Sequence, residues 1–237
     1  MDGRILPQNC RILSGSALKV LAVLCMLIDH SAFLLARNPI PLFTVLGKQI
    51  SVYYLMHLIG RMAFPIFACL IVEGYLHTHS RLRYGAVLLL FAVLSEVPWD
   101  LNRSGAFWDF SKQNVFFTLF LGYLGICAYE GLRNKWFLRA GTIVVLLLGS
   151  ILLRADYGLT GFCFILLMYA LRDHELLRDA IGTGALTSQW KAGLAFVPLA
   201  LYNGKRGFIK GSALKYAFYL VYPLHLLALY CIKHYVL

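Results

Sequence analysis

Long apolar stretches, separated by short basic turns, make up most of this chain. An apolar run of about 20 residues is long enough to cross a lipid bilayer as a helix. Capping, turn and charged residues mark where such runs begin and end. On this basis we predict membrane helices at about 14–36, 52–77, 84–97, 115–131, 191–201 and 212–235, and two more that end near Leu153 and Leu171.

The stretch 172–189 is open to two interpretations. It is polar first and then small and weakly apolar, so it is either a loop or a short spanning or re-entrant segment. The chain is therefore expected to have eight or nine membrane segments. Basic residues gather on the cytoplasmic side of membrane proteins. With the N-terminus inside, nine segments place the basic residues more unevenly than eight do, so the charge pattern favours nine.

Proline and glycine refine this prediction at three places. Residues 37–51 contain both and are expected to form a loop with an interfacial piece. Pro65 removes a backbone hydrogen bond and is expected to kink the helix 52–77. Pro98 is expected to mark the end of the preceding helix. The first apolar run lacks a small-residue cleavage site, which favours a retained helix over a signal peptide.

Composition agrees with the hydrophobic pattern. Of the 237 residues, 60% are hydrophobic and 14% are charged, whereas charged residues make up about 25% of soluble domains. The chain is thus predicted to be an all-α, polytopic membrane bundle that forms one unit over residues 1–237. Its net charge of +11 is scattered over the loops with no basic block, so we expect no nucleic-acid partner. The six cysteines are dispersed and are expected to be small apolar fillers.

Asp29 and His30 are adjacent near the far end of the first apolar run. Ionisable groups are costly inside a bilayer and mark functional sites by default. His30 follows Ser14 by about fifteen helical residues, which places it beyond the midplane toward the outer side. Its imidazole suits a general base for an incoming hydroxyl or amine. Asp29 projects about 100° round the helix from His30 and is expected to face another helix. A water-satisfied interfacial pair is an equally good interpretation.

The second long run carries further ionisable residues. His57 and Arg61 are four residues apart and therefore share a helix face. An intramembrane Arg must be paired or face a wet cavity, and the candidate partners are Asp29, Glu73 and Glu96. A structural ion pair is as good an explanation for Arg61 as a catalytic role. Glu73 precedes a glycine, which allows close approach of another group and favours a functional role.

Two further groups of residues are candidates for binding. In the last helix, Tyr222 and His225 lie three residues apart on one stripe. Residues 203–210 offer cations and glycine-rich backbone that would suit phosphate groups, although a basic loop that only sets topology is the more ordinary interpretation. Lys19 shares a helix face with His30, about 16 Å toward the cytoplasm. Sequence signatures of nucleotide hydrolases, zinc hydrolases and the common serine hydrolases are absent.

Several short blocks, in order along nearly the whole chain, resemble the TraX family. They are Ser-Gly-Ser-Ala-Leu-Lys…Met-Leu-Ile-Asp-His (14–30), Gly-Arg-Met-Ala-Phe-Pro-Ile-Phe…Glu-Gly-Tyr (60–75), Ser-Glu-Val-Pro-Trp-Asp (95–100), Gln-Asn-Val-Phe-Phe-Thr-Leu (113–119), Asp-Tyr-Gly…Gly (156–161), Tyr-Asn-Gly-Lys-Arg-Gly (202–207) and Phe-Tyr-Leu-Val-Tyr-Pro-Leu-His (218–225). The family prototype acetylates the N-terminus of conjugative pilin. The family is related to the type 3 membrane acyltransferases, which carry acyl groups from cytoplasmic acyl-CoA to acceptors beyond the membrane.

The resemblance implies an acyltransferase-3-like bundle in a bacterial inner membrane, with the N-terminus in the cytoplasm. It implies acetyl-CoA as donor, no metal, and an acceptor amine or hydroxyl on a peptide, a pilin N-terminus or a cell-surface glycan. His30 matches the essential His of the wider group and would be the general base or a transient acyl carrier. The other implied site residues are Asp29 and Arg61 (orienting His30), Glu73, Glu96, Asn114, Tyr222 and His225 (substrate) and Lys19, Asn203, Lys205 and Arg206 (CoA).

A second hypothesis belongs to a different class. In a small-molecule or proton-coupled transporter, Asp29, His57, Glu73 and Glu96 would form a relay. Many transporter folds carry internal repeats, and none is visible in this sequence. The chain also departs from the type 3 enzymes, because it is shorter and has no second Arg near Arg61. The acyltransferase remains the first hypothesis, and the acceptor stays open.

Overall fold

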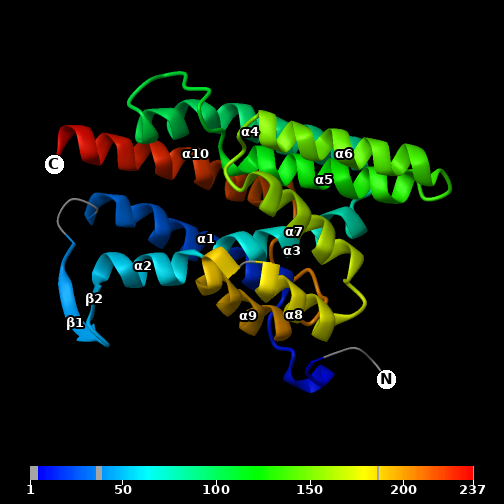
Figure 1. Cartoon of the computed structure of the whole chain (residues 1–237), viewed down its shortest axis with the longest axis horizontal. Helices are drawn as coiled ribbons and strands as arrows, with labels where there is room; N and C mark the ends of the chain where they lie inside the picture. The colour runs from blue at the N-terminus through cyan, green and yellow to red at the C-terminus, as the bar shows by residue number, and fades with distance from the viewer. Residues whose placement is uncertain (1–4, 36–38, 186, 237) are drawn as a thin grey trace.

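The computed structural model describes residues 5–35, 39–185 and 187–236. The described part is almost entirely helical, with one small hairpin (Figure 1). Its elements are η1 (Gln8–Cys10), α1 (Gly15–Ser31), η2 (Ala32–Leu35), β1 (Pro41–Val45), β2 (Lys48–Ser51), α2 (Val52–Gly60), α3 (Ala63–His77), α4 (Arg81–Arg103), α5 (Val115–Gly131), α6 (Trp136–Leu152), α7 (Gly158–Ala170), α8 (Glu175–Ala185), η3 (Thr187–Ala195), α9 (Phe196–Ala200) and α10 (Ser212–Tyr235).

Four stretches of the described chain are long and apolar enough to cross a membrane, which confirms the prediction of a membrane protein. They are Gly15–Leu35, Val52–His77, Arg81–Arg103 and Ala213–Tyr235. The apolar helices Val115–Gly131, Trp136–Leu152, Gly158–Ala170 and Lys191–Ala200 are shorter. Large apolar side chains are exposed along several of these helices, as expected for a surface that faces lipid rather than water.

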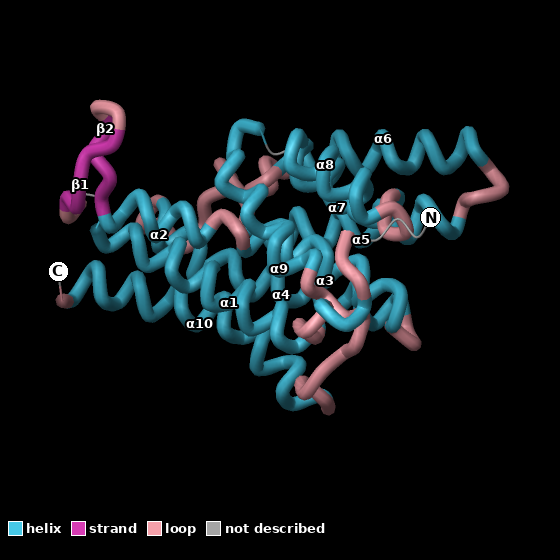
Figure 2. The backbone as a smooth tube through the Cα atoms, turned by 90° about the horizontal axis from the view of Figure 1, so that it is seen from below, coloured by secondary structure: helices cyan, strands magenta, loops and turns pink. Residues whose placement is uncertain are grey.

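The helices pack as a bundle whose members run mainly along the long axis of the molecule (Figure 1). One apolar core joins α1, α3, α4, α5, α7 and α10. Small residues allow close contact in it: a Cβ on Gly122 of α5 would lie 2.4 Å from Ile165 Cδ1 of α7. Close packing of this kind replaces the hydrophobic driving force that lipid removes. The hairpin stands clear of the bundle at one end (Figure 2).

The predicted helix 52–77 is broken rather than kinked at its proline. α2 ends at Gly60, and α3 begins at Ala63 after a turn at Arg61 and Met62. Pro65 is therefore the third residue of α3, where its missing N–H costs nothing. A continuous helix would bring the Pro65 ring against the carbonyl of Arg61. The break consequently falls four residues before the proline and places Arg61 in the turn.

Two boundary predictions were wrong. α4 runs on to Arg103 and contains Pro98, so Glu96 lies inside the helix and not at its end. Residues 41–51 form a β-hairpin and not the expected loop. Apolar residues on both sides of the turn at Leu46 and Gly47 support strand pairing. The first prediction, 14–36, agrees with the structure, because α1 continues as a 3₁₀ turn to Leu35 and the apolar span is Gly15–Leu35; Ala36 lies outside the described residues.

The ambiguous stretch 172–189 contains the short amphipathic helix α8. The apolar run that follows does not form one spanning helix. It divides into the 3₁₀ segment η3 and the five-residue helix α9. The predicted segment at 191–201 is thus present as the short apolar helix Lys191–Ala200, whose first part has 3₁₀ geometry.

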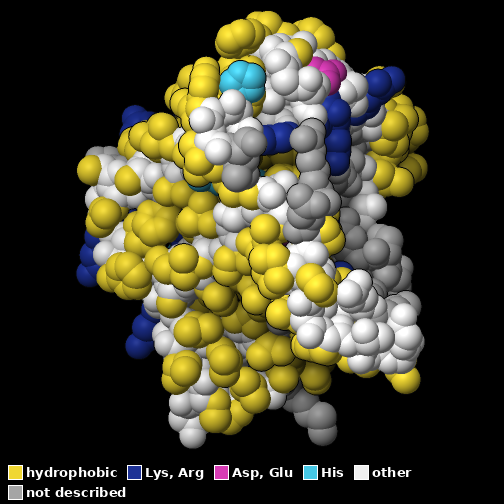
Figure 3. Space-filling view, turned by 90° about the vertical axis from the view of Figure 1, so that its left-hand side faces the viewer, with side chains coloured by type: hydrophobic (Ala, Val, Ile, Leu, Met, Phe, Trp, Pro, Cys, Tyr) yellow, Lys and Arg dark blue, Asp and Glu magenta, His cyan; other side chains and the backbone are white. Residues whose placement is uncertain are grey.

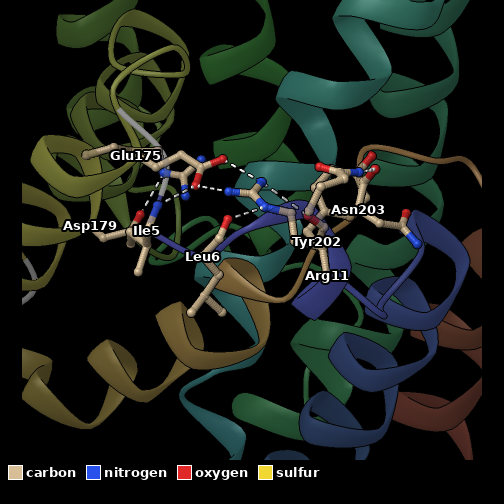
Figure 4. Close-up of polar contacts among 9 residues, drawn as sticks. Ile5, Leu6, Arg11, Glu175, Asp179, Tyr202 and Asn203 are labelled. Carbon is tan, nitrogen blue, oxygen red and sulfur yellow. Dashed lines mark hydrogen bonds and ion pairs between the residues drawn. The ribbon is translucent and has the colours of Figure 1, made fainter. Parts of the chain in front are cut away.

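The N-terminal leader is tied to α8 by an ion pair (Figure 4). Arg11 Nη1 and Nη2 donate to the two carboxylate oxygens of Glu175 at 2.8 and 2.5 Å. The backbone N–H of Ile5 donates to the same carboxylate at 3.3 Å. Burial by itself would raise the pKa of Glu175, but the hydrogen bonds from Arg11 and Ile5 outweigh it and the pKa is lowered. A bidentate, charge-assisted pair of this kind is among the stronger polar contacts.

We expect this pair to stabilise the protein in a pH-dependent way. The folded pKa of Glu175 is below its unfolded value. The stabilisation is therefore complete above the unfolded pKa of about 4.3 and is lost as the pH falls through the lowered folded pKa. Glu175→Gln should lower stability at pH 7 by about 1–3 kcal/mol, measured by thermal unfolding in detergent. The difference from the wild type should shrink as the pH falls below that unfolded pKa.

Asp173→Asn is the matched control, because Asp173 also pairs with an arginine but its side chain is 76% exposed. Exposed pairs contribute little. A pH-independent loss in Glu175→Gln, or an equal loss in Asp173→Asn, would contradict the prediction.

Candidate functional site

His30 and His225 form the centre of the candidate site. His30 is near the C-terminal end of α1, and His225 is in the middle of α10. Their Nδ1 and Nε2 atoms, respectively, are 2.6 Å apart. The two rings are stacked, with centroids 4.9 Å apart and planes within 6°. Tyr222, one turn earlier on α10, packs its buried ring edge-on against both imidazoles. Tyr222 and His225, predicted to share one face of the last helix, thus contact His30 of the first helix.

A backbone carbonyl sets which nitrogen of His30 carries the lone pair. His225 Nδ1 lies 2.8 Å from the carbonyl oxygen of Val221, which can only accept a hydrogen bond. Neutral His225 therefore carries its proton on Nδ1 and has its lone pair on Nε2. His30 Nδ1 must then donate to that lone pair, which leaves the lone pair of His30 on Nε2. The arrangement prepares Nε2 of His30 to act as a base or a nucleophile.

Asp29 has its partner on α2, as the helix geometry predicts. Its Oδ1 is 2.8 Å from Nδ1 of His57. Gly60 makes this approach possible, because a Cβ at that position would lie 2.2 Å from the Asp29 Cβ. Arg61 is attracted to Asp29 and hydrogen-bonds with Tyr157. Of the three partners predicted for Arg61, the structure thus brings Asp29 near it.

Aromatic rings connect the His30–His225 pair with the Asp29–His57 pair. Phe33 stacks on His30 at 6.1 Å and meets His57 edge-on at 6.2 Å. Tyr53 lies edge-on against the other side of His57, at 4.5 Å. The His30–His225 pair and the Asp29–His57 pair are therefore both in contact with aromatic rings near the C-terminal end of α1. Phe33 and Tyr53 were missed by the sequence analysis, because apolar runs give no signal that tells a site wall from a lipid-facing ring.

A cavity lies at the opposite, N-terminal end of α1. It has a volume of about 330 Å³ and is lined by the start of α1, the end of α3, the loop before α10 and the first turn of α10. Three cations line it, namely Lys19, Arg206 and Lys215. Glu73 lines it too and accepts a hydrogen bond of 2.8 Å from the Tyr202 hydroxyl. The charged residues of the lining are thus mostly basic, with one hydrogen-bonded carboxylate among them, and we call it the basic cavity.

A second, narrower cavity of about 80 Å³ extends from the basic cavity toward the histidines. The two share Lys19, Leu70 and Lys215. The remaining lining is apolar and aromatic and ends at Tyr222, which contacts His30. Lys19 and His30 are 11 residues apart on α1, or about 16 Å along the helix axis. A series of cavity-lining residues therefore leads from the start of α1 to Tyr222, whose ring packs against His30.

Residues 203–206 bind the protein's own backbone. The carbonyls of Lys205 and Arg206 accept from the N–H groups of Gly15 and Ser16 at 2.8 and 2.9 Å, so they cap the start of α1. The Asn203 side chain accepts from the Lys205 N–H at 2.9 Å. Three backbone N–H groups of the predicted phosphate loop, those of Asn203, Lys205 and Ile209, already donate within the protein. Of the four predicted CoA contacts, Lys19 and Arg206 line the cavity, whereas Asn203 and Lys205 are absent from its lining.

The structure places Glu96 and Asn114 together and gives them a packing role. The Asn114 side chain donates to Glu96 Oε2 and also, at 2.8 Å, to the carbonyl of Ala92. Asn114 Oδ1 caps the start of α5 by accepting from the Phe116 N–H. The pair thus joins α4 to α5. The contacts of Glu96 and Asn114 thus lie between α4 and α5, whereas Tyr222 and His225, predicted for the same substrate role, both contact His30.

Comparison with known proteins identifies relatives by sequence. A family model described as "TraX protein" matches residues 14–233. A protein of Dichelobacter nodosus, described as "Probable fimbrial assembly protein FimC, serogroup H1", is 27% identical over 246 residues, covering 92% of this chain and 94% of that protein. Comparison with the solved structures finds no match. Both sequence matches extend over nearly the whole chain, so the similarity includes both ends of α1.

The direction of the hydrogen bond between His30 and His225 predicts which ring nitrogen of neutral His30 carries the proton. In ¹⁵N spectra of histidine-labelled protein in bilayers, neutral His30 should carry its proton on Nδ1. His225→Phe removes the acceptor and should abolish that preference, whereas His174→Phe, at an exposed position, should not change it. A wild-type His30 signal typical of the Nε2-protonated tautomer would contradict the assignment.

Proposed function

Because the chain belongs to the TraX family, we propose that it is a membrane-embedded acyltransferase that moves an acetyl group from cytoplasmic acetyl-CoA to an acceptor beyond the membrane. One observation carries this proposal. A cavity with three cations at the start of α1 shares lining residues with an apolar cavity that reaches Tyr222, and the Tyr222 ring packs against His30 and His225. That shape suits a donor with a phosphate-rich head, a narrow arm and a reactive thioester at its tip.

The chemistry of each part of the passage matches a part of the donor. Lys19, Arg206 and Lys215 would attract the phosphates of CoA, since lysine and arginine are the usual phosphate-binding side chains. The apolar second cavity would take the arm and exclude water. Tyr222 would hold the thioester end beside His30. The leaving CoA would then stay on the cytoplasmic side of the passage.

His30 Nε2 is the proposed reacting atom. As a general base it would take the proton of the acceptor amine or hydroxyl while that atom attacks the thioester carbon. The carbon–sulfur bond then breaks, and the CoA thiolate leaves and takes up that proton. As a transient acyl carrier, Nε2 would itself attack the thioester carbon, and the carbon–sulfur bond would break to release the CoA thiolate. The acceptor would then attack the acyl carbon, the bond from that carbon to Nε2 would break, and the acceptor proton would pass to the thiolate by way of Nε2. In both cases positive charge develops on His30, and the lone pair of His225 Nε2 stabilises it through the His30 Nδ1–H.

Asp29 and Arg61 are proposed to be positioning residues. Asp29 holds His57 and packs against Gly60, and together these contacts fix the end of α1 that carries His30. Arg61 occupies the turn between α2 and α3 and is drawn to Asp29. Their effect on the reaction would pass through the orientation of His30 and not through contact with the substrate.

We further propose the acceptor and the orientation. The relative from Dichelobacter nodosus is described as a fimbrial assembly protein, which favours the N-terminal amine of a pilin-like peptide over a cell-surface glycan. The N-terminus would lie in the cytoplasm of a bacterial cell, where acetyl-CoA enters at the start of α1. The protein would cross the inner membrane eight or nine times in an acyltransferase-3-like bundle, using the shorter apolar helices as well as the four long ones.

The transporter hypothesis finds less support in the geometry. Its relay requires Asp29, His57, Glu73 and Glu96 to communicate. Glu73 is bonded to Tyr202 and Glu96 to Asn114, in different parts of the bundle from the Asp29–His57 pair. The described residues thus show three separate carboxylate contacts, whereas a proton relay would need a connected chain of groups.

The proposed role of His30 can be tested by substitution. His30→Ala should lower the transfer of labelled acetyl groups from acetyl-CoA, in membranes that also contain the acceptor, by about 10²–10⁴-fold. His174→Ala is the matched control, because His174 is exposed and lies on the turn before α8. Undiminished transfer in His30→Ala would exclude His30 as the reacting group.

The second prediction concerns the basic cavity. Arg206→Gln should raise the KM for acetyl-CoA several-fold and leave kcat nearly unchanged, because it removes a charge that binds donor and transition state alike. Lys210→Gln, an exposed lysine in the same loop but absent from the cavity lining, should change neither constant. An equal rise in KM for the two substitutions would contradict the prediction, because it would show that the net charge of the loop, and not the cavity, determines the KM for acetyl-CoA.

A further inference from the structure

The β1–β2 hairpin extends sideways from the bundle at the end where α1 finishes. α1, α2 and α10 run along the long axis of the molecule, whereas the two strands run across it and away from the helices (Figures 1 and 2). β2 passes directly into α2, which begins the apolar stretch Val52–His77. If the long axis lies along the membrane normal, the hairpin lies in the plane of the membrane surface.

Apolar side chains of this hairpin are exposed on both faces of its sheet. The exposed apolar residues are Ile40, Leu42, Phe43, Val45 and Leu46. An isolated two-stranded hairpin is marginally stable in water, and exposed apolar strands promote aggregation. Lys48 is the only charged residue in the sequence 39–51. An apolar environment would therefore stabilise this element, whereas water would not.

Leu46, at the tip of the hairpin, gives the most specific indication. Its φ is +49° and that of Gly47 is +76°, and tight hairpin turns with two positive φ values favour Asn-Gly. A leucine in this conformation is strained. Leu46 is nevertheless 99% exposed, so burial against the described residues does not offset that strain. Transfer of a leucine side chain into an apolar phase is favourable and would offset it.

A second segment, apart from the hairpin, also exposes large apolar side chains. The loop between α4 and α5 exposes Phe107, Trp108 and Phe110, and it lies toward the same end of the molecule (Figure 1). Figure 3 views this end and shows hydrophobic side chains over much of the face, with charged groups gathered near its top and edge. Aromatic side chains are enriched where membrane proteins pass through the lipid headgroups. Two separate segments thus mark one interface.

We propose that the β1–β2 hairpin lies in the headgroup region of the lipid bilayer, with Leu46 and Phe43 in contact with acyl chains. Apolar burial provides the attraction, as it does for interfacial amphipathic segments. The lipid-held hairpin fixes the start of α2, which carries His57 one to two turns further on. The membrane thereby helps to hold one side of the candidate site. This inference concerns lipid contact and does not require that the protein transfer acyl groups.

The test uses tryptophan fluorescence in the full-length protein in bilayers. Leu46→Trp adds a fluorophore at the hairpin tip, and its emission is obtained by subtracting the wild-type spectrum. Asn134→Trp is the control, because Asn134 is exposed in a polar turn between Arg133 and Lys135. Brominated acyl chains should quench the added emission of Leu46→Trp at least about twofold more than that of Asn134→Trp. Iodide in solution should show the opposite preference.

Phe43→Trp provides a second position in case the tip substitution disturbs the turn, and it should show the same lipid quenching. Stronger quenching of both hairpin variants by iodide than by brominated lipid would overturn the proposal. Protection from both quenchers would also overturn it, since it would show that protein, such as an added peptide strand or a second copy of the chain, covers the hairpin.

Discussion

Polar side chains inside this bundle must find their partners on other helices, because lipid offers none. That constraint accounts for the principal contacts between its elements. His30 on α1 meets His225 on α10, and Asp29 on α1 meets His57 on α2. The same rule gives Glu96 its contact with Asn114, which joins α4 to α5. Each contact fixes one helix against another at a defined rotation, so the polar groups specify which packing the apolar surfaces adopt.

α1 is the element on which both halves of the proposed reaction depend. Its first turn is capped by the carbonyls of Lys205 and Arg206, and this fixes the loop whose Arg206 side chain reaches the basic cavity. Its last turn carries Asp29 and His30. A helix keeps these two ends at a constant separation and rotation. A donor bound at the start of α1 would consequently meet His30 in a reproducible position, without a moving part between them.

The break between α2 and α3 shows how one proline shapes the site. Pro65 prevents the helix from continuing past Arg61, so the chain turns there and α2 ends at Gly60. The glycine then lets α2 approach Asp29 closely enough for the His57 contact. The neighbouring hairpin adds a contribution from outside the protein, because the proposed lipid contact at Leu46 holds the start of α2.

The sequence by itself determined that this is a helical membrane protein, because long apolar runs can be recognised locally. It also singled out four residues, because polar groups inside such runs are costly exceptions: His30, Asp29, Tyr222 and His225. It did not determine that His30 and His225 touch, that Lys215 joins Lys19 in one cavity, or that α4 continues through Pro98. Those facts depend on helix rotation and packing between residues far apart in the chain. Periodicity gives a helix its faces, but only the tertiary structure decides which face meets which neighbour.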